Sequence, residues 1–550
     1  MFKRQKRKYR LQLAMIGLIG SQLTNNLFYS EDFPNFLALK KASAFTAIVN
    51  SGDTVTDEIV DGASQDVYGT AVNTAINSGG NQYVHIDGVT TGTQINAGGS
   101  QTLSGGFSET VELNGGNQYV NSGTTTGVKI NLNGNQFIYS GGIATDVEIT
   151  SGGYQYIYGG ATSDVDIKSG GNQRVYGSAV VSDVEISGTQ TLVDGGSVTN
   201  STINLGGVQD ITLGTTTDTK IAGGSQIVRS GTTSDVTITL DGLQEIYGPA
   251  VVTNVEITSG RQYIDGGTVS DVRVGPAGIQ EVWSGIATGN RINSGGKQLL
   301  HGGLVIDTTI AGGGIQELYS GGTAQDTQAN DGGMIYFARN GANLTGDTIL
   351  NGGIIAFDMG TDVINFVTGN VANLSGNGQI HLNTNLEILA GDLLVINGTS
   401  VGNYQVYVNN QGNAVVNPTD TLTVIETADG GANFSIGHQV EVGGYLYDIQ
   451  KAGTNWQLFT TQEGTSTASA SINAFSGNYL LNYAETQSLI QRLGDLRQKK
   501  NGRNIWAKAF GGEFNSSTNS FLNGYNMSYH GIQIGSDKQI SLKQGKGDVY

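Results

Sequence analysis

The chain has 550 residues, of which 85 are glycine, 4 are proline, none is cysteine and 13% are charged. Glycine is far above its average share of roughly 7% but does not recur at every third position, which excludes a collagen-like chain. The 37% hydrophobic content argues against general disorder, and the net charge of −18 makes nucleic acid an unfavourable partner. Without cysteine, disulfides and thiolate metal sites are excluded. A glycine-punctuated all-β protein remains.

The N-terminus carries positive charge that the rest of the chain lacks. Residues 1–41 have a net charge of +6, so the remainder carries −24. The basic run from Lys3 to Arg10 precedes LQLAMIGLIG at 11–20, an apolar stretch typical of a secretory signal and too short to span a bilayer. We therefore expect residues 1–44 to be a signal or targeting region and the chain to be exported. A buried strand behind a basic tail is the alternative.

A glutamine recurs in steps of 17, 18 or 19 residues, and Met334 takes its place one step further on. An apolar residue stands two places after each glutamine, as Val84 does after Gln82, and another stands four to six places before each from Gln82 onward. This pattern predicts two short strands per repeat, with turns between them. The series is Gln65, Gln82, Gln101, Gln118, Gln136, Gln155, Gln173, Gln190, Gln209, Gln226, Gln244, Gln262, Gln280, Gln298 and Gln316.

Strands this short are marginally stable alone, so the repeats must stack. Coils wound about one axis bury their Val and Ile side chains in columns and give each strand parallel partners, whereas glycine disfavours helical repeats by roughly 1 kcal/mol per position. The sequence therefore predicts a right-handed parallel β-helix over residues 45–339. Glycines should form its corners, and the glutamines should share one corner, where their amides stack as a structural ladder.

Aspartates form a second column ahead of the apolar residue that precedes the glutamine, in phrases such as ATDVEI. Stacked carboxylates could hold a cation. The favoured interpretation is that each aspartate closes a turn by bonding its own backbone. The column contains Asp146, Asp164, Asp183, Asp218, Asp235 and Asp271.

No motif predicts a catalytic, cofactor-binding or metal site. Carboxylates spaced for glycoside hydrolysis are spread evenly and do not mark one local break in the pattern. His85 and His301 are about twelve coils apart, roughly 58 Å. Residues 398–402 satisfy GxSxG, but a strand-like stretch follows where a nucleophile elbow needs a helix. The remaining histidines show no ligand spacing: His381, His438 and His530.

The pattern changes after the glutamine series. Residues 340–465 alternate as further strands placed to close the solenoid. Residues 466–477 are small and polar, which predicts a linker, and 479–500 predict a helix with Leu489, Leu493 and Leu496 at helical spacing. Residues 501–550 alternate like the first strands of a membrane β-barrel.

This order of parts resembles the autotransporters, the type V secreted proteins of Gram-negative bacteria, and among them the AIDA-like and antigen 43-like adhesins. The NSGGNQYV-type repeats look like that family's passenger repeat, and residues 340–465 are similar to its pertactin-like autochaperone segment. RLGDLR at 492–497, with NIWAKAFGG and YHGIQIGSDKQI after it, looks like the linker helix and the opening strands of the translocator barrel. The resemblance therefore implies a truncated barrel.

The resemblance implies a cell-surface adhesin that mediates adherence, autoaggregation or biofilm formation, with no enzymatic activity and no cofactor. The implied partners are other copies of the chain on neighbouring cells, host or abiotic surfaces, and the Sec export and outer-membrane assembly machinery. The implied location is the cell surface or outer membrane with a complete barrel, and the periplasm otherwise. Two alternatives stay open: a β-helix enzyme that degrades polysaccharide, and an inert truncated product that does not reach the surface.

Overall fold

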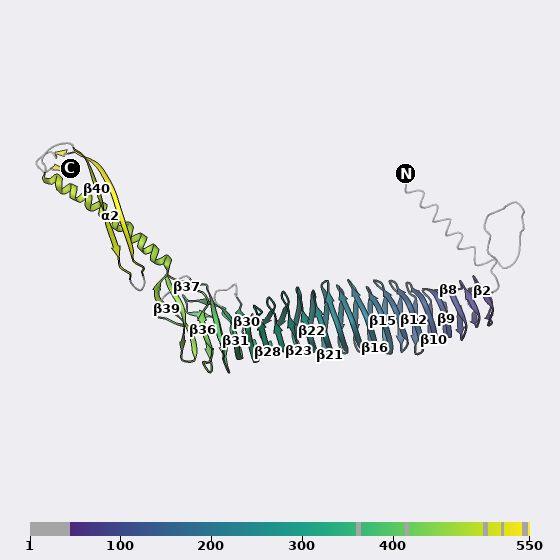
Figure 1. Cartoon of the computed structure of the whole chain (residues 1–550). Helices are drawn as coiled ribbons and strands as arrows, with labels where there is room; N and C mark the ends of the chain where they lie inside the picture. The colour runs from purple at the N-terminus through teal and green to yellow at the C-terminus, as the bar shows by residue number, and fades with distance from the viewer. Residues whose placement is uncertain are drawn as a thin grey trace, which may run out of the picture. The chain divides into compact units, whose positions relative to one another are not determined.

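The computed structural model shows a β-solenoid, then one long helix and a β-hairpin (Figure 1). It describes residues 45–358, 365–412, 417–498, 504–518, 522–538, 540–541 and 548–549. The predicted signal region, residues 1–44, lies outside the described residues. Within the solenoid the coils follow one another in chain order along one axis (Figure 1). The predicted parallel β-helix is confirmed.

Each coil has three limbs around a filled core, as the coil of Gln155 shows. Strand β13 (Tyr154–Tyr158) is the first limb, and Gln155 is one of its buried residues. Strand β14 (Ala161–Ile167) bends at Asp164, which divides it into a second and a third limb. Alternate residues of every limb point inward, since side chains alternate between the two faces of a strand. The prediction of two strands per repeat therefore missed one limb.

The strands that carry the ladder glutamines are β4 (Ser64–Val67), β7 (Asn81–His85), β9 (Ser100–Asn114), β10 (Asn117–Ile130), β11 (Asn135–Tyr139), β13, β15 (Asn172–Ile186), β16 (Thr189–Asn204), β17 (Val208–Ile211), β19 (Ser225–Val228), β21 (Gly242–Ile257), β22 (Gly260–Val274), β23 (Gly278–Thr288), β25 (Lys297–Leu300) and β27 (Ile315–Leu318). The other strands of these coils are β1 (Ile48–Val49), β2 (Thr54–Thr56), β3 (Ile59–Val60), β5 (Thr70–Val72), β6 (Ala75–Ile76), β8 (Val89–Asn96), β12 (Gly142–Ile149), β14, β18 (Thr215–Ala222), β20 (Thr232–Thr239), β24 (Arg291–Ile292), β26 (Leu304–Ile310) and β28 (Thr323–Asn330).

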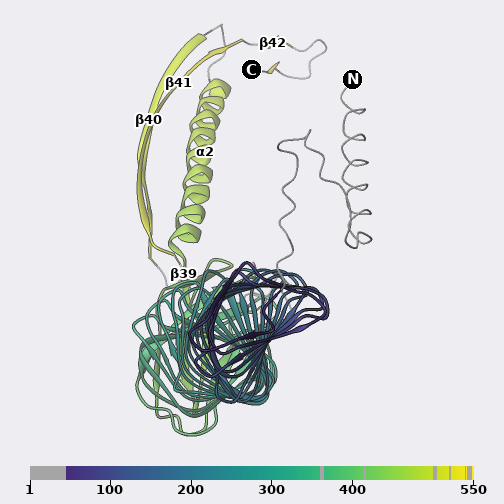
Figure 2. The same cartoon turned by 90° about the vertical axis from the view of Figure 1, so that its right-hand side faces the viewer.

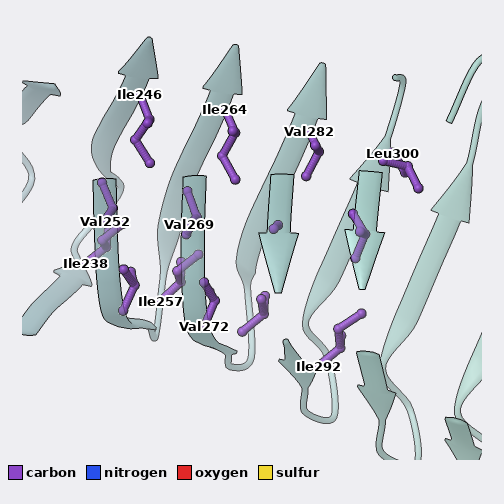
Figure 3. Close-up of a cluster of buried hydrophobic side chains, with 14 of the residues drawn as sticks. Ile238, Ile246, Val252, Ile257, Ile264, Val269, Val272, Val282, Ile292 and Leu300 are labelled. Atoms are coloured by element: carbon purple, nitrogen blue, oxygen red, sulfur yellow. The ribbon is translucent and has the colours of Figure 1, made fainter. Parts of the chain in front are cut away.

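The core is built from columns of like side chains. Neighbouring coils pair in parallel and in register, so that Ile167 pairs with Ile149 on one side and with Ile186 on the other. Figure 3 shows such columns, among them Ile246 and Ile264, in a part of the core where these side chains are fully buried. Burial stabilises by roughly 1.5–3 kcal/mol per Val, Leu or Ile side chain, and stacking provides it for every coil.

The recurring glycine pair has two separate causes. Gly152, the first glycine of one pair, adopts φ +75°, a conformation that costs other residues strain. A Cβ on Gly153, the second, would lie 2.4 Å from the carbonyl oxygen of Ile130 in the coil before. One glycine therefore makes the turn, and the other allows two backbones to approach closely.

Antiparallel strands close the C-terminal end of the solenoid. Strand β39 runs antiparallel to both β35 and β38, and β38 in turn to β37. Trp456 and Leu458 of β39 are buried there, and the end of the stack is covered. The strands after the ladder are β29 (Met334–Phe337), β30 (Asn343–Phe357), β31 (Thr368–Asn385), β32 (Ala390–Gly391), β33 (Leu393–Ile396), β34 (Asn403–Asn410), β35 (Leu422–Thr427), β36 (Asn433–Ile436), β37 (Val440–Val442), β38 (Tyr445–Ala452) and β39 (Asn455–Gly464).

Helix α2 (Ser466–Gln498) begins directly after the last solenoid strand. The Oγ1 of Thr465 accepts a hydrogen bond from the backbone N–H of Ala468 at 3.0 Å, which is the geometry of a helix N-cap. The prediction of a linker over 466–477 is therefore wrong, because a cap and several alanines favour helix there. Within the part of the chain that the structure describes, no helix is sufficiently long and apolar to cross a membrane.

A β-hairpin lies alongside this helix (Figure 2). It consists of the antiparallel strands β40 (Asn504–Ser516) and β41 (Tyr525–Asp537). Arg492 of the helix donates to Asp537 at 2.6 Å, and Lys508 donates to Gln491 at 2.6 Å. Two short strands follow, β42 (Ile540–Ser541) and β43 (Asp548–Val549).

Candidate interaction surface

The ladder glutamines lie next to one another inside the solenoid. Each is fully buried, and from Gln82 onward the Nε2 of each donates a hydrogen bond to the Oε1 of the glutamine one coil earlier, at 2.5–2.9 Å. They occupy strands, not a corner, so their predicted position is wrong. A buried amide needs both a donor and an acceptor, and the neighbouring rungs supply them.

The ladder ends at Gln316, whose side-chain oxygen has no hydrogen-bond partner. Its register partner in the next coil is Ile335, whereas Met334 pairs with Ile315. The expectation that Met334 continues the ladder is therefore wrong by one residue, because that coil is longer than the preceding one. Because the ladder is closed to solvent, an interaction surface has to lie on the outside of the coils.

The aspartate column marks the bend between the second and third limbs. All six predicted aspartates have φ between 52° and 56°, a left-handed conformation that asparagine and aspartate tolerate better than most residues. They lie at a bend of the chain, and the hydrogen bond from each aspartate to its own backbone stays a prediction. Asn200 and Asn254 take the same place in other coils and donate to Asp183 and Asp235 of the coil before, both at 2.5 Å. Among the described residues, no group of three or more His, Asp or Glu could hold a metal ion.

A continuous row of hydroxyl side chains runs next to this column. Its members are half-buried, face outward from the second limb, and directly precede the residue at the bend. Neighbouring members are register partners, and Thr145 donates to Thr126 at 3.0 Å. We name this row the hydroxyl stripe: Thr126, Thr145, Ser163, Ser182, Thr199, Thr217, Ser234, Thr253, Ser270 and Thr288.

The outward residues of the first limbs form an aromatic face. Phe137 stacks between Tyr119 and Tyr156, with ring centroids 5.0 and 5.1 Å apart. Further along the axis, His301 stacks at 4.2 Å on both Trp283 and Tyr319. Sequence reasoning missed this face. Its signal was present, because aromatic residues recur one and three places after the ladder glutamine.

Charges on the aromatic face are paired between neighbouring coils. Arg261 contacts Glu281 at 2.6 Å, and Lys297 contacts Glu317 at 3.2 Å. Glu317 also accepts a hydrogen bond from the Tyr319 hydroxyl at 3.0 Å. Burial, with Glu317 as the second cause, raises the pKa of Tyr319 to about 12. Charge is therefore balanced at these coils although the chain as a whole is acidic.

Four of the five histidines join aromatic stacks, at three separate places along the solenoid. His85 stacks on Tyr68 at 4.3 Å, and its Nε2 lies 2.8 Å from the Oδ1 of Asp66. His301 belongs to a different stack, as described above. His381 and His438 lie on either side of Tyr407, with ring centroids 4.9 and 5.5 Å from it.

The GxSxG serine is structural. Ser400 is fully buried and is followed by strand β34, not by a helix. Its Oγ donates to Asp429 at 2.5 Å and accepts from the backbone N–H groups of Gly431 and Ala432 at 3.1 Å. Hydrogen bonds from Ser400 and the local backbone lower the pKa of Asp429 to about 2. A carboxylate with so low a pKa is a poor general base. The hydrogen bonds of Ser400 and Asp429 instead hold a turn of the backbone in place.

A second carboxyl group with a shifted pKa is structural as well. Burial raises the pKa of Asp392, which accepts hydrogen bonds from the backbone N–H of Val367 at 2.8 Å and from Asn383 at 2.7 and 2.8 Å. These bonds tie the 383–392 turn to the coil before it. The two shifted carboxyl groups, Asp392 and Asp429, therefore serve separate turns.

Comparison with known proteins shows that the chain is similar to autotransporters. The Pertactin family model matches residues 346–460. The probable autotransporter YcgV of Escherichia coli K12 is 37% identical over 215 residues, which cover 32% of this chain and 22% of YcgV. The autotransporter adhesin/invasin TibA of Escherichia coli O78:H11 is 34% identical over 89 residues, which cover 16% of this chain and 9% of TibA. The match thus spans less than a quarter of either relative.

One solved structure in this comparison is the crystal structure of a TibC-catalyzed hyper-glycosylated TibA fragment. The alignment covers 59% of this chain and 98% of that chain, at 27% identity and a TM-score of 0.30.

Proposed function

We propose that this chain, which carries a pertactin-type segment and has autotransporter homologues, is a passenger that acts at the cell surface by adhesion and not by catalysis. Its export and surface display follow from the same kinship. One named relative, TibA, is an adhesin/invasin. The Ser400 and carboxylate geometry described above supports a binding role, because the shifted carboxyl groups and the GxSxG serine are each engaged in turns.

The observation that carries the proposal is the hydroxyl stripe. Ten coils present a Thr or Ser at the same place, over roughly 43 Å at the strand spacing. One exposed hydroxyl binds weakly, but a row in fixed register can engage a matching row on a second copy many times at once. We assign self-association of cells, adherence and biofilm formation to this repeated surface, with a second copy of the chain as its principal partner.

The charge of the chain sets the conditions for pairing. Residues 42–550 carry −24, and the stripe borders the aspartate column, so two copies repel each other. Salt at about 0.15 M shortens the range of this repulsion to about 8 Å. We therefore expect self-association to strengthen as ionic strength rises from low values.

Surface display tests the proposal. The described repeats are expressed with an intact translocator barrel on a host that does not clump, and settling and adherence are recorded over a range of salt concentrations. We expect faster settling than in the host alone, and more so with added salt. Unchanged settling together with no adherence, in cells whose surface display is verified by antibody labelling, would refute the proposal.

A matched pair of variants locates the contact. The first carries Thr145→Glu, Thr217→Glu and Thr253→Glu on the hydroxyl stripe. The second carries Thr202→Glu, Thr237→Glu and Thr309→Glu, which are outward residues of the third limb. Both sets add the same charge by the same substitution. We expect the first to abolish settling and the second to preserve most of it.

A further inference from the structure

One gap in the aromatic face lies near the end of the solenoid. Ala356 of strand β30 pairs with Tyr336 in the coil before and with His381 in the coil after. An alanine therefore stands where both neighbours carry a ring. The gap is a hollow of about 310 Å³, which we name the slot; its lining includes Ala356, Tyr336, His381, Tyr407 and Asn409.

The depth of the slot matches a ring-shaped ligand. Tyr336 and His381 belong to coils two steps apart, which is roughly 9.6 Å at the strand spacing. A ring held between two others needs contacts of about 3.5–4.0 Å on each side, or about 7–8 Å in all. The remaining space suits a ring thicker than a flat aromatic one, such as a puckered pyranose. The volume lies at the lower end of the range of about 300–1,000 Å³ typical of ligand sites.

The side chains of the slot are already held in place. Tyr336 donates its hydroxyl proton to Asp358 at 2.7 Å, and Tyr407 donates to Gln405 at 3.1 Å. The ring of Tyr407 also packs against His381 at 4.9 Å. Walls fixed before binding lose little side-chain entropy when a ligand enters.

Amide groups border the slot. The His381 Nε2 lies 2.9 Å from the Oε1 of Gln379, and a second hollow of about 510 Å³ beyond it is lined by Gln379, Gln405, Asn377 and Asn403. Each side-chain amide both donates and accepts hydrogen bonds, which is what the hydroxyl groups of a sugar require. Amides therefore lie where the substituents of a ring in the slot would point.

Charge argues for an uncharged ligand. The residues that line the slot include no lysine, arginine, aspartate or glutamate. In the adjoining hollow of about 350 Å³, Asp358 is paired with Arg339, and Glu317 with Lys297. A charged ligand would lose its hydration on entering the slot and would find no unpaired counter-charge to compensate for that loss.

We propose that the slot binds one pyranose ring of an uncharged saccharide, with Tyr336 and His381 against its two C–H faces, Tyr407 supporting His381 from the coil behind it, and Gln379 and Gln405 near its hydroxyl groups. This site is separate from the hydroxyl stripe and does not depend on self-association. It gives the passenger a local saccharide-binding function in addition to its extended polar surface.

Saturation-transfer difference NMR on the full chain tests the proposal. The probes are methyl β-D-glucopyranoside, methyl β-D-galactopyranoside and N-acetyl-D-glucosamine, with glucuronate as a charged comparator and indole as a flat one. A ligand of this size binds in the millimolar range, which this measurement detects. We expect signals from the ring C–H protons of at least one uncharged sugar, and weak or no signals from glucuronate.

Ala356→Phe is the diagnostic variant. It places a ring between Tyr336 and His381 and fills the slot, so we expect it to fold and to weaken binding at least about tenfold. Thr102→Phe is its control, because it adds the same ring between Tyr83 and Tyr119 in the same column of the aromatic face. We expect this control to bind as the parent chain does.

Three results would overturn the proposal: no signal from any uncharged sugar, sugar signals that survive Ala356→Phe in a folded chain, or binding of indole alone. If Ala356→Phe fails to fold, Tyr407→Ala replaces it, with Tyr156→Ala as the matched loss of a ring from an unbroken stack. Loss of sugar binding in the first but not in the second supports the slot. Equal effects in both refute it.

Discussion

Replacing one glutamine in the middle of the buried ladder should destabilise the chain strongly. In the parent chain, Gln173 donates to the Oε1 of Gln155 at 2.7 Å and accepts from the Nε2 of Gln190 at 2.5 Å. Gln173→Met keeps the length of the side chain and removes both bonds. One acceptor and one donor are then left unsatisfied in a core that water does not reach.

The magnitude follows from that count. Each unsatisfied buried polar group costs about 1–3 kcal/mol, so Gln173→Met should lower the free energy of unfolding by about 2–6 kcal/mol. Gln316→Met is the control. It leaves the Oε1 of Gln298 unsatisfied but removes the Oε1 of Gln316, which is already unsatisfied. The number of unsatisfied groups does not change, and we expect a loss of less than about 1 kcal/mol.

A double variant sharpens the test. Gln173→Met combined with Gln190→Met leaves the Oε1 of Gln155 and the Nε2 of Gln209 without their ladder partners, again one acceptor and one donor. The double variant should therefore cost about as much as Gln173→Met alone, although independent substitutions would add.

Urea unfolding followed by circular dichroism measures these free energies. Native-state hydrogen exchange in the coils around residue 173 locates the loss, because a solenoid can open locally. The reasoning fails if Gln316→Met costs as much as Gln173→Met. It also fails if the two substitutions of the double variant add.

Further predictions concern single positions. Thr110 is an exposed β-branched residue with φ 57°, a strained conformation, so Thr110→Asn should raise the free energy of unfolding by about 1 kcal/mol. Gly127→Thr, at the same place of the next coil, should lower it for the same reason. The midpoints of urea unfolding check both. The pKa of Asp429 is about 2 in the folded chain and about 3.9 in the unfolded chain. The ionised carboxylate therefore stabilises the fold above pH about 4, and this stabilisation is lost as the pH falls to about 2. Asp429→Asn should remove this acid-dependent part of the free energy of unfolding. Burial, and then His438, lower the pKa of His381, so the folded chain binds fewer protons there than the unfolded chain and loses stability as the pH falls below about 6.5. His381→Phe should therefore make the thermal unfolding midpoint depend less on pH in that range. An unchanged pH dependence would contradict the assignment.

The winding of the chain was predictable from its period, and the direction of the glutamines was predictable but missed. Gln82 and Val84 are two places apart on one strand, so they face the same way. Because the apolar column is buried, the glutamine column has to be buried with it. The general tendency of glutamine to be exposed pointed the other way, and the strand geometry overrides it.

The bend in each coil and the start of the helix had weaker signals. Asp57, Asn73 and Gly92 occupy the same bend in successive coils, and these residue types share a tolerance for positive φ. A single phrase such as ATDVEI hides this, because it looks like one strand. The helix likewise begins at a threonine cap, Thr465, within a stretch whose serines and threonines look like a linker.

The slot could not be predicted, because it depends on register between coils of unequal length. The steps along the core column are 19 residues from Gln316 to Ile335, 20 from Ile335 to Ile355, and 25 from Ile355 to Ile380. While the ladder lasts, each glutamine needs the next one opposite it, and a slip of one residue would turn every amide outward and bury the outward residues. That requirement holds the coils at 17–19 residues as far as Gln316. Beyond it the glutamine ladder no longer fixes the register, coil length varies, and the residue that pairs with both Tyr336 and His381 is an alanine.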